Sequence, residues 1–158
     1  MKFAIRAART LNCIFVAIVV VIVIATSTQY AEAQEHKAVN LGTATGLPFS
    51  DGIIAGNTLY IAGQQGTDSS GKLVSGGIGP ETAATLGAIE KVVKAAGFEM
   101  KDIVSVTVYL ADIHEFPEMN KVYKGVMPDP KPARATIQAA ALVNNARIEI
   151  SAIAVKQK

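Results

Sequence analysis

The sequence predicts an α+β domain of two layers, in which two helices cover one face of a mixed sheet of about six strands. Residues 102–111 alternate apolar and polar side chains, as expected for a strand with one buried face. Residues 80–97 and the segment that starts at Pro117 instead repeat apolar residues at helical spacing. After a short leading strand near residues 35–42, the elements follow the order strand, strand, helix, strand, helix, strand, strand. Two helices leave one sheet face uncovered, so we expect a second subunit to cover it.

Turn and cap residues set the limits of these elements. Residues 53–64 are predicted to form a hairpin, because apolar residues flank the turn dipeptide Gly56-Asn57. Pro80 suits the first position of a helix, and Gly97 suits the position after its last residue. One face of the strand over residues 102–111 is expected to carry Val104, Val106, Val108 and Leu110. One face of the second helix is expected to carry Met119, Val122, Tyr123 and Val126.

The first 33 residues are predicted to be a secretory signal peptide that does not belong to the domain. Positive side chains come first, at Lys2, Arg6 and Arg9. An unbroken apolar run follows over residues 14–25, and Ala31-Glu32-Ala33 then fits the small-x-small rule for cleavage after Ala33. The alternative is a retained membrane anchor, but the run is shorter than the roughly 20 apolar residues that a spanning helix needs. We therefore expect one mature domain over residues 34–158, in the periplasm or secreted.

The predicted mature part has no net charge. Cleavage removes Lys2, Arg6, Arg9 and Glu32 from totals of 15 basic and 13 acidic residues, which leaves 12 of each. Proteins that bind nucleic acid normally carry a basic patch or stripe. We therefore expect no nucleic-acid partner.

The cysteine and histidine content argues against metal and thiol chemistry. Cys13 is the one cysteine and leaves with the signal peptide, so the mature part has no disulfide, thiolate nucleophile or cysteine ligand. His36 and His114 lack a His or Cys partner at metal-ligand spacing. We therefore expect no metal site.

Two charged side chains interrupt the apolar strands that close the chain. Arg134 begins the first strand, Glu149 lies inside the second, and the short turn 143–146 joins them. One interpretation is that Glu149 faces water or a polar interface, because charged residues are rarely buried unpaired. The other is functional: a hairpin would bring both residues to the same end region of the sheet. An arginine fork there could hold a carboxylate, while the glutamate orients or deprotonates water.

Motifs along the whole mature part resemble a known family. The closing strands read PARATIQAAAL and, five residues later, IEI. Further matches are YIAGQQG at 60–66, GKLVSGG at 71–77, VTVYLADIHEF at 106–116 and MNKVYKG at 119–125. In this order they resemble the Rid family of enamine/imine deaminases, also called YjgF/YER057c/UK114, over about residues 39–155. The resemblance implies a chorismate-mutase-like α+β fold that assembles as a homotrimer, with sites in the clefts between subunits.

The resemblance also implies an activity and the residues that perform it. Such proteins hydrolyse 2-imino acids such as 2-iminopropanoate and 2-iminobutanoate, or their enamine tautomers, to 2-keto acids and ammonia, with no cofactor. Arg134 falls on the arginine that holds the substrate carboxylate, and Glu149 on the catalytic glutamate that positions the attacking water. The other implied substrate-binding positions are Phe49, Ala62, Gly63, Gln64, Asn120 and Thr136.

Four positions depart from the family pattern. Phe49 replaces a tyrosine, Ala62 a serine, Ser151 a glutamate and Val143 a proline. Two cleft hydroxyl groups are thereby absent, and each lost hydrogen bond to a charged group costs ~1.5–3 kcal/mol. The alternative function is therefore a trimeric carboxylate-binding protein with weak or no deaminase activity. An endoribonuclease or translation inhibitor, a label that the family also carries, is disfavoured by the absence of net charge.

Overall fold

The computed structural model describes residues 35–42, 46 and 48–157, which form a six-stranded sheet and two α-helices. The strands are β1 (His36–Val39), β2 (Gly52–Ala55), β3 (Thr58–Gln64), β4 (Ile103–Leu110), β5 (Ala133–Gln138) and β6 (Ile148–Val155). The helices are α2 (Ile78–Ala95) and α3 (Phe116–Val126), with 3-10 turns η2 (Met100–Asp102), η3 (Ile113–Glu115) and η4 (Val143–Asn145). The predicted signal peptide lies outside these residues and stays a prediction. Within them, no helix is both long and apolar enough to cross a membrane.

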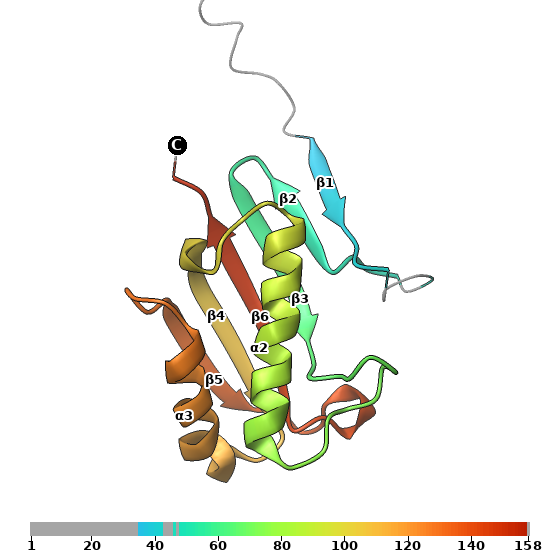
Figure 1. Cartoon of the computed structure of the whole chain (residues 1–158), viewed down its shortest axis with the longest axis vertical. Helices are drawn as coiled ribbons and strands as arrows, with labels where there is room; N and C mark the ends of the chain where they lie inside the picture. Colours follow the sequence, from blue (N-terminus) through green and yellow to red (C-terminus); the bar gives the residue numbers. More distant parts are fainter. Residues whose placement is uncertain (1–34, 43–45, 47, 158) are drawn as a thin grey trace, which may run out of the picture. The chain divides into compact units, whose positions relative to one another are not determined.

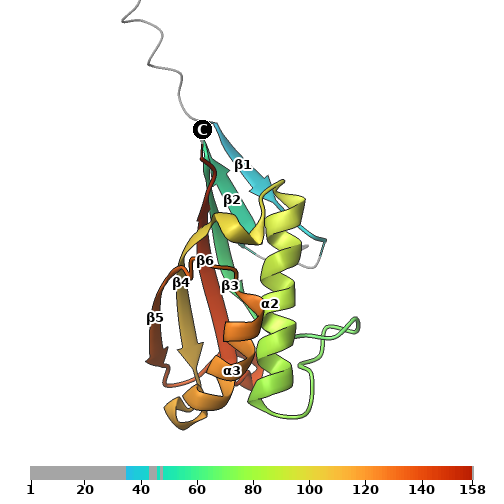
Figure 2. The ribbon, with the colours of Figure 1, turned by 60° about the vertical axis from the view of Figure 1, so that its left-hand side comes forward.

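Both helices pack on the same face of the sheet, which confirms the predicted two-layer α+β fold (Figures 1 and 2). The strand order is β1-β2-β3-β6-β4-β5, with β5 parallel to β4 and all other neighbours antiparallel. The largest fully buried side chains include Leu59, Leu86, Ile89, Leu110, Met119, Ile148 and Ile150. Full burial of such a side chain contributes about 1.5–3 kcal/mol. Because Ile148 and Ile150 both face this core, the residue between them must face the other way.

Local sequence sets both ends of α2. The helix begins at Ile78, two residues before the predicted start, so Pro80 lies in its first turn, where proline is tolerated. At the other end, Gly97 takes a left-handed conformation with φ of 75°. The N–H of Phe98 then returns to the carbonyl of Val93 at 2.9 Å. This way of closing a helix favours glycine, as the sequence predicts.

The last two strands do not form the hairpin that the sequence predicts. β4 lies between β5 and β6, and β5 is an edge strand that pairs with β4. The chain passes from β4 to β5 through α3, because parallel neighbours require a crossover connection. The segment after β5 therefore carries the chain past β4 to β6. In it, Asn144 and Asn145 take left-handed φ values of 60° and 59°, which asparagine tolerates better than most residues.

Two residues of the predicted apolar faces are exposed. Val104 is 47 % exposed, because the register between β4 and β6 shifts between Ile103 and Ser105. Such a bulge turns one residue outward and brings Ile103 into the core instead. Val126 is 43 % exposed as the last residue of α3, and the next residue, Met127, is buried.

The second face of the sheet exposes large apolar side chains and carries no helix in the part of the chain that the structure describes. The register places Tyr60, Ile153, Ser105 and Ala133 side by side across β3, β6, β4 and β5. Tyr60 is 50 % exposed, and Ile137 on β5 is 49 % exposed. Apolar sheet faces are normally buried against another layer. A second copy of the chain remains the expected cover.

Candidate active site

One face of α3 holds the side chain of Arg134. Arg134 is in register with the buried Val106, so it points to the helix side of the sheet. Its Nη2 donates a hydrogen bond to Asn120 Oδ1 at 2.8 Å. Its guanidinium carbon lies 4.4 Å from the ring centre of Tyr123 and 5.5 Å from that of Phe116. Phe116, Asn120 and Tyr123 are spaced by four and three residues along α3, so they lie on the same face of the helix. Together they fix the planar guanidinium.

Two buried hydroxyl groups near Arg134 lack a hydrogen-bond partner among the described residues: the Tyr123 hydroxyl and Thr136 Oγ1. Thr136 follows Arg134 by two positions on β5 and therefore shares its side of the sheet. Burial raises the pKa of the Tyr123 phenol above its ordinary value, although the Arg134 cation opposes this shift, so the phenol keeps its proton at neutral pH. A buried polar group without a partner costs about 1–3 kcal/mol.

A shallow, mostly apolar hollow of about 420 Å³ adjoins the α3 face that holds Arg134. It is lined by Ile113, His114, Phe116 and Pro117, from η3 and the first turn of α3. Phe116 also stacks near Arg134, so the hollow and the guanidinium share a wall. An anion held by Arg134 would therefore have an apolar surface beside it.

Glu149 is the acidic residue of the uncovered sheet face. Its neighbours Ile148 and Ile150 are buried in the core, so alternation turns Glu149 to the other side of β6. Glu149 Oε2 accepts a hydrogen bond from Gln65 Nε2 at 2.9 Å. Glu149 Oε1 lies over Gly63, where an added Cβ would be only 2.2 Å from it. Gly63 therefore leaves open the space that the carboxylate occupies.

Arg134 and Glu149 of one chain do not face each other. Along β4, Arg134 is in register with Val106, whereas Glu149 is in register with Tyr109, three residues further on. Arg134 projects to the helix side and Glu149 to the uncovered side. The prediction that a hairpin brings them together is therefore wrong, because β4 separates the two strands and the residues point to opposite faces.

The side chain that contacts Glu149 is Gln65, which the sequence analysis missed. The predicted Gln64 instead donates its Nε2 to the carbonyl of Ala62 at 3.3 Å. The register between β3 and β6 shifts after Ile61, so counting alternate residues does not show which glutamine faces Glu149. The sequence did offer one sign of it, because Gln64 is followed by a second glutamine that could contact Glu149 instead.

The remaining predicted positions differ in where they lie. Asn120 and Thr136 lie beside Arg134, as described above. Ala62 is half-buried in β3, and Phe49 is 55 % exposed in the segment before β2. Within the described residues, the rings that lie against Arg134 are those of Phe116 and Tyr123 and not that of Phe49, so the place of Phe49 in a site stays a prediction.

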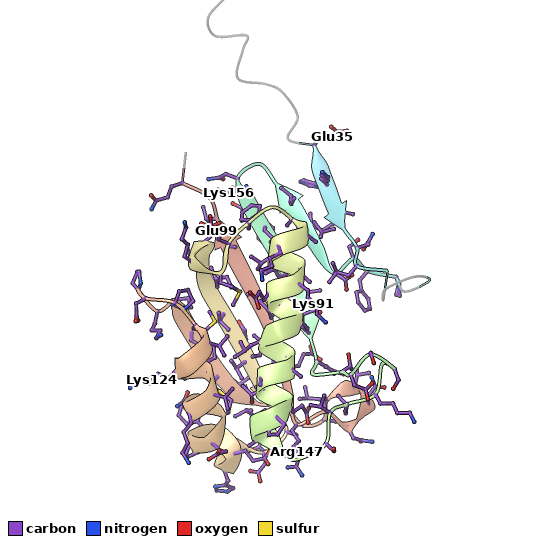
Figure 3. All side chains as sticks on the ribbon, in the orientation of Figure 1. Glu35, Lys91, Glu99, Lys124, Arg147 and Lys156 are labelled. Atoms are coloured by element: carbon purple, nitrogen blue, oxygen red, sulfur yellow. The ribbon has the colours of Figure 1, made fainter. Side chains whose placement is uncertain are left out.

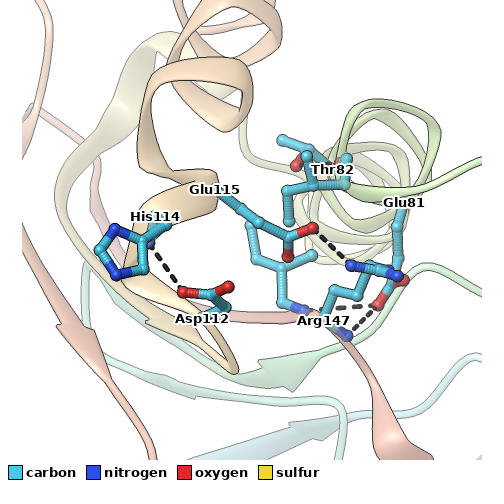
Figure 4. A network of polar contacts seen from close by, with 8 residues as sticks. Glu81, Thr82, Asp112, His114, Glu115 and Arg147 are labelled. Atoms are coloured by element: carbon cyan, nitrogen blue, oxygen red, sulfur yellow. Dashed lines mark hydrogen bonds and ion pairs between the residues drawn. The ribbon is translucent and has the colours of Figure 1, made fainter.

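A buried acidic network fixes the start of β6 (Figure 4). Glu81, in the first turn of α2, is 4 % exposed. Its Oε1 accepts hydrogen bonds from the N–H of Arg147 at 2.7 Å and from the N–H of Ile148 at 3.4 Å. The Arg147 guanidinium pairs with Glu115 of η3. These contacts join α2, η3 and β6 directly before Glu149.

Glu81→Ala is expected to destabilise the protein, because it removes the acceptor of the Arg147 and Ile148 N–H groups. Unsatisfied buried donors cost about 1–3 kcal/mol, so the urea midpoint should fall while the slope of the transition stays the same. Glu81→Gln retains an acceptor oxygen and should keep most of the stability. An unchanged midpoint in Glu81→Ala would contradict this role.

Several basic side chains of the described residues either lie apart from one another or pair with acidic neighbours. Figure 3 shows Lys91 on α2, Lys124 on α3 and Lys156 beyond β6 well apart from one another. Other lysines pair with nearby glutamates, in Lys94–Glu90, Lys101–Glu99 and Lys121–Glu118. The same residues contain no group of three or more His, Cys, Asp or Glu that could hold a metal ion.

Comparisons with known proteins point to one family. The model of a family described as Endoribonuclease L-PSP matches residues 42–156. The human protein named 2-iminobutanoate/2-iminopropanoate deaminase is 44% identical over 110 residues, which cover 69% of this chain and 80% of that protein. The structure of the E. coli YjgF gene product is 28% identical with a TM-score of 0.72, over 77% of this chain and 99% of the other. E. coli TdcF with bound serine is 28% identical with a TM-score of 0.66, over 70% and 89%.

Proposed function

Since the chain belongs to the Rid family, whose model is described as endoribonuclease L-PSP, we propose that it hydrolyses 2-imino acids and their enamine tautomers to 2-keto acids and ammonia. The observation that carries this proposal is the guanidinium of Arg134, which α3 holds in place. The human relative is named for two such acids, 2-iminobutanoate and 2-iminopropanoate. TdcF binds serine, which has the same carboxylate next to a carbon that carries nitrogen.

Arg134 is suited to bind the carboxylate of the substrate. A guanidinium has five N–H donors in a fork, and within the described residues Asn120 takes one of them. The others match the geometry of a carboxylate. The hollow beside Phe116 would take the short alkyl group of the substrate.

Glu149 is suited to take a proton from the attacking water. The water oxygen bonds to the imine carbon, Glu149 accepts one water proton, and the π electrons of the C=N bond move to nitrogen. Glu149 returns this proton to the nitrogen, a second proton reaches the nitrogen from the carbinol hydroxyl, and the nitrogen leaves as ammonia with the electrons of the C–N bond. The carbinol oxygen loses its proton and becomes the keto oxygen, so imino acid and water give keto acid and ammonia. General-base assistance of this kind contributes about 10²–10⁴-fold in rate.

The proposed site needs two copies of the chain. Arg134 lies on the edge strand β5 and faces α3, whereas Glu149 faces the uncovered side of the sheet. A neighbour packed on that uncovered face could place its own Arg134 opposite Glu149. Repeating one such head-to-tail contact around an axis closes a ring. We propose a homotrimer with a site at each subunit interface.

A carboxylate-binding protein with weak or no turnover is the alternative, and Phe49 and Ala62 favour it. Both positions lack the hydroxyl that the family pattern has there. Such a protein would keep the Arg134 anchor and bind 2-keto or amino acids. It would not accelerate the loss of ammonia.

The test is a coupled assay. An amino-acid oxidase generates 2-iminopropanoate or 2-iminobutanoate, and semicarbazide traps the imine that escapes hydrolysis. The proposal predicts that the protein suppresses semicarbazone formation and that Arg134→Ala does not. If neither suppresses it while the wild type binds 2-ketobutanoate in calorimetry, the carboxylate-binding alternative holds.

Gly63→Ala should lower this activity by displacing the Glu149 carboxylate. The new methyl group would lie 2.2 Å from Oε1, so the Glu149 side chain must move. A misplacement of about 1 Å can cost roughly 100-fold in rate. Gly87→Ala on α2, where an added Cβ meets nothing within 4 Å, is the matched control and should keep full activity. Full activity in Gly63→Ala would show that Glu149 does not act from the position described.

A further inference from the structure

The side chain of Gln65 joins Glu149 to the segment between β5 and β6. Its Nε2 donates to Glu149 Oε2 at 2.9 Å and to the carbonyl oxygen of Val143 at 3.1 Å. Its Oε1 accepts a longer hydrogen bond from Asn144 Nδ2 at 3.5 Å. The amide thus uses both of its N–H donors and its oxygen on three different residues. Gln65 is itself half-buried, just beyond the end of β3.

These partners determine which end of the amide faces Glu149. Carboxylate and carbonyl oxygens can only accept hydrogen bonds, so the N–H₂ group must face Glu149 and Val143. The flipped amide would place an oxygen against two acceptors and an N–H₂ group against the donor of Asn144. Gln65 therefore presents a donor to the carboxylate in one orientation only.

The two oxygens of Glu149 consequently differ. Oε2 is held by Gln65, whereas Oε1 lies over Gly63, in space that a side chain would otherwise fill. We propose that Gln65 is the positioning residue of Glu149, holding Oε2 so that Oε1 is the atom that takes the proton from water. The role of Oε1 rests on the proposed function, but the positioning of the carboxylate does not.

The segment after β5 supports this arrangement. Asn144 has a φ of 60°, which places its backbone in the left-handed region, and η4 presents the Val143 carbonyl to Gln65. The amide is therefore anchored by two contacts that do not involve Glu149. A side chain fixed in this way holds a carboxylate with less loss of freedom than a mobile surface residue would.

Kinetics of two variants test the proposal. Gln65→Leu keeps the approximate size of the side chain and removes its donors. It should lower kcat by about 10- to 150-fold, the range expected for a lost hydrogen bond to a charged group. KM should change much less, because Arg134 binds the substrate carboxylate. A residue that only stabilised the fold would lower the amount of active protein without separating kcat from KM.

The near-isosteric variant Gln65→Glu sharpens the test. It keeps the shape of the side chain and sets a second carboxylate against Glu149, so kcat should fall at least as far as in Gln65→Leu. Gln157→Glu, the same exchange at an exposed residue beyond β6, is the matched control and should keep wild-type activity. Wild-type kcat in both Gln65 variants would overturn the proposal.

A double-mutant cycle in urea separates this proposal from the proposed function. Gln65→Leu should lower the urea midpoint, and the shift should become smaller in a Glu149→Leu background, because the contact is already absent there. An equal shift in both backgrounds would overturn the positioning role. If the shift depends on Glu149 but the wild type hydrolyses no imine, the positioning stands and the proposed function fails.

Discussion

Replacing Glu149 by glutamine is expected to lower kcat for imine hydrolysis by about 10²–10⁴-fold, the usual contribution of a general base. The amide has the same shape as the carboxylate, and its oxygen can still accept the hydrogen bond of Gln65. It cannot take a proton from water at neutral pH. Binding of the product should change little, because Arg134 lies on another element and retains its α3 contacts.

Two measurements check this prediction. Initial rates in the coupled assay give kcat and KM, and calorimetry with 2-ketobutanoate gives the affinity for the product. Glu90→Gln is the matched control, since Glu90 pairs with Lys94 on the exposed side of α2 and should tolerate the change. A Glu149→Gln variant with wild-type kcat would remove Glu149 from the mechanism and leave Arg134 as a binding residue only.

Much of the fold could be predicted because each signal is local. The turn at Gly56-Asn57 does join β2 to β3, with Ala55 opposite Thr58. Gly97 does end α2. Such signals depend on the backbone preferences of one or two residues or on the period of a single element, and the chain displays both directly.

Pairing between distant strands could not be predicted in the same way. The apolar sequences of β5 and β6 suit a hairpin as well as two strands separated by β4, because every strand of the sheet needs one buried face. The position of β5 depends on the crossover through α3, whose face carries Asn120 and Tyr123 against Arg134. Bulges have a similar effect, since an extra residue at Val104 changes which side chains are buried without leaving a mark in the alternation.

The candidate site was predicted in part for the same reason. Resemblance to a family identified Arg134 and Glu149 and implied sites between subunits, whereas the residue pattern alone suggested a hairpin within one chain. The register places the two side chains of one chain on opposite sides of the sheet, because alternate residues of a strand face opposite sides. Gln65 was missed because its contact with Glu149 depends on the irregular end of β3.

Replacing Arg134 by alanine is the second large effect that we expect. Loss of one partner of a hydrogen-bonded charge pair costs about 2–5 kcal/mol, or roughly 30- to 5,000-fold in kcat/KM. Arg134→Lys keeps the charge but not the planar fork or its stacking on Tyr123, so it should recover only part of the loss. Urea midpoints identify any variant whose fold is impaired. Full recovery in Arg134→Lys would mean that charge alone binds the substrate.

The two variants together test whether the site lies between subunits. Arg134→Ala and Glu149→Gln should each be nearly inactive as pure assemblies, because every site lacks one of the two groups. If a site takes Arg134 from one subunit and Glu149 from its neighbour, random mixing of equal amounts should leave about a quarter of the interfaces with both groups intact. Activity should therefore return when the two proteins are unfolded together and refolded, and not when they are combined after folding. If both groups of a site came from one chain, no mixture would regain activity, and the opposite orientations of Arg134 and Glu149 would need another explanation.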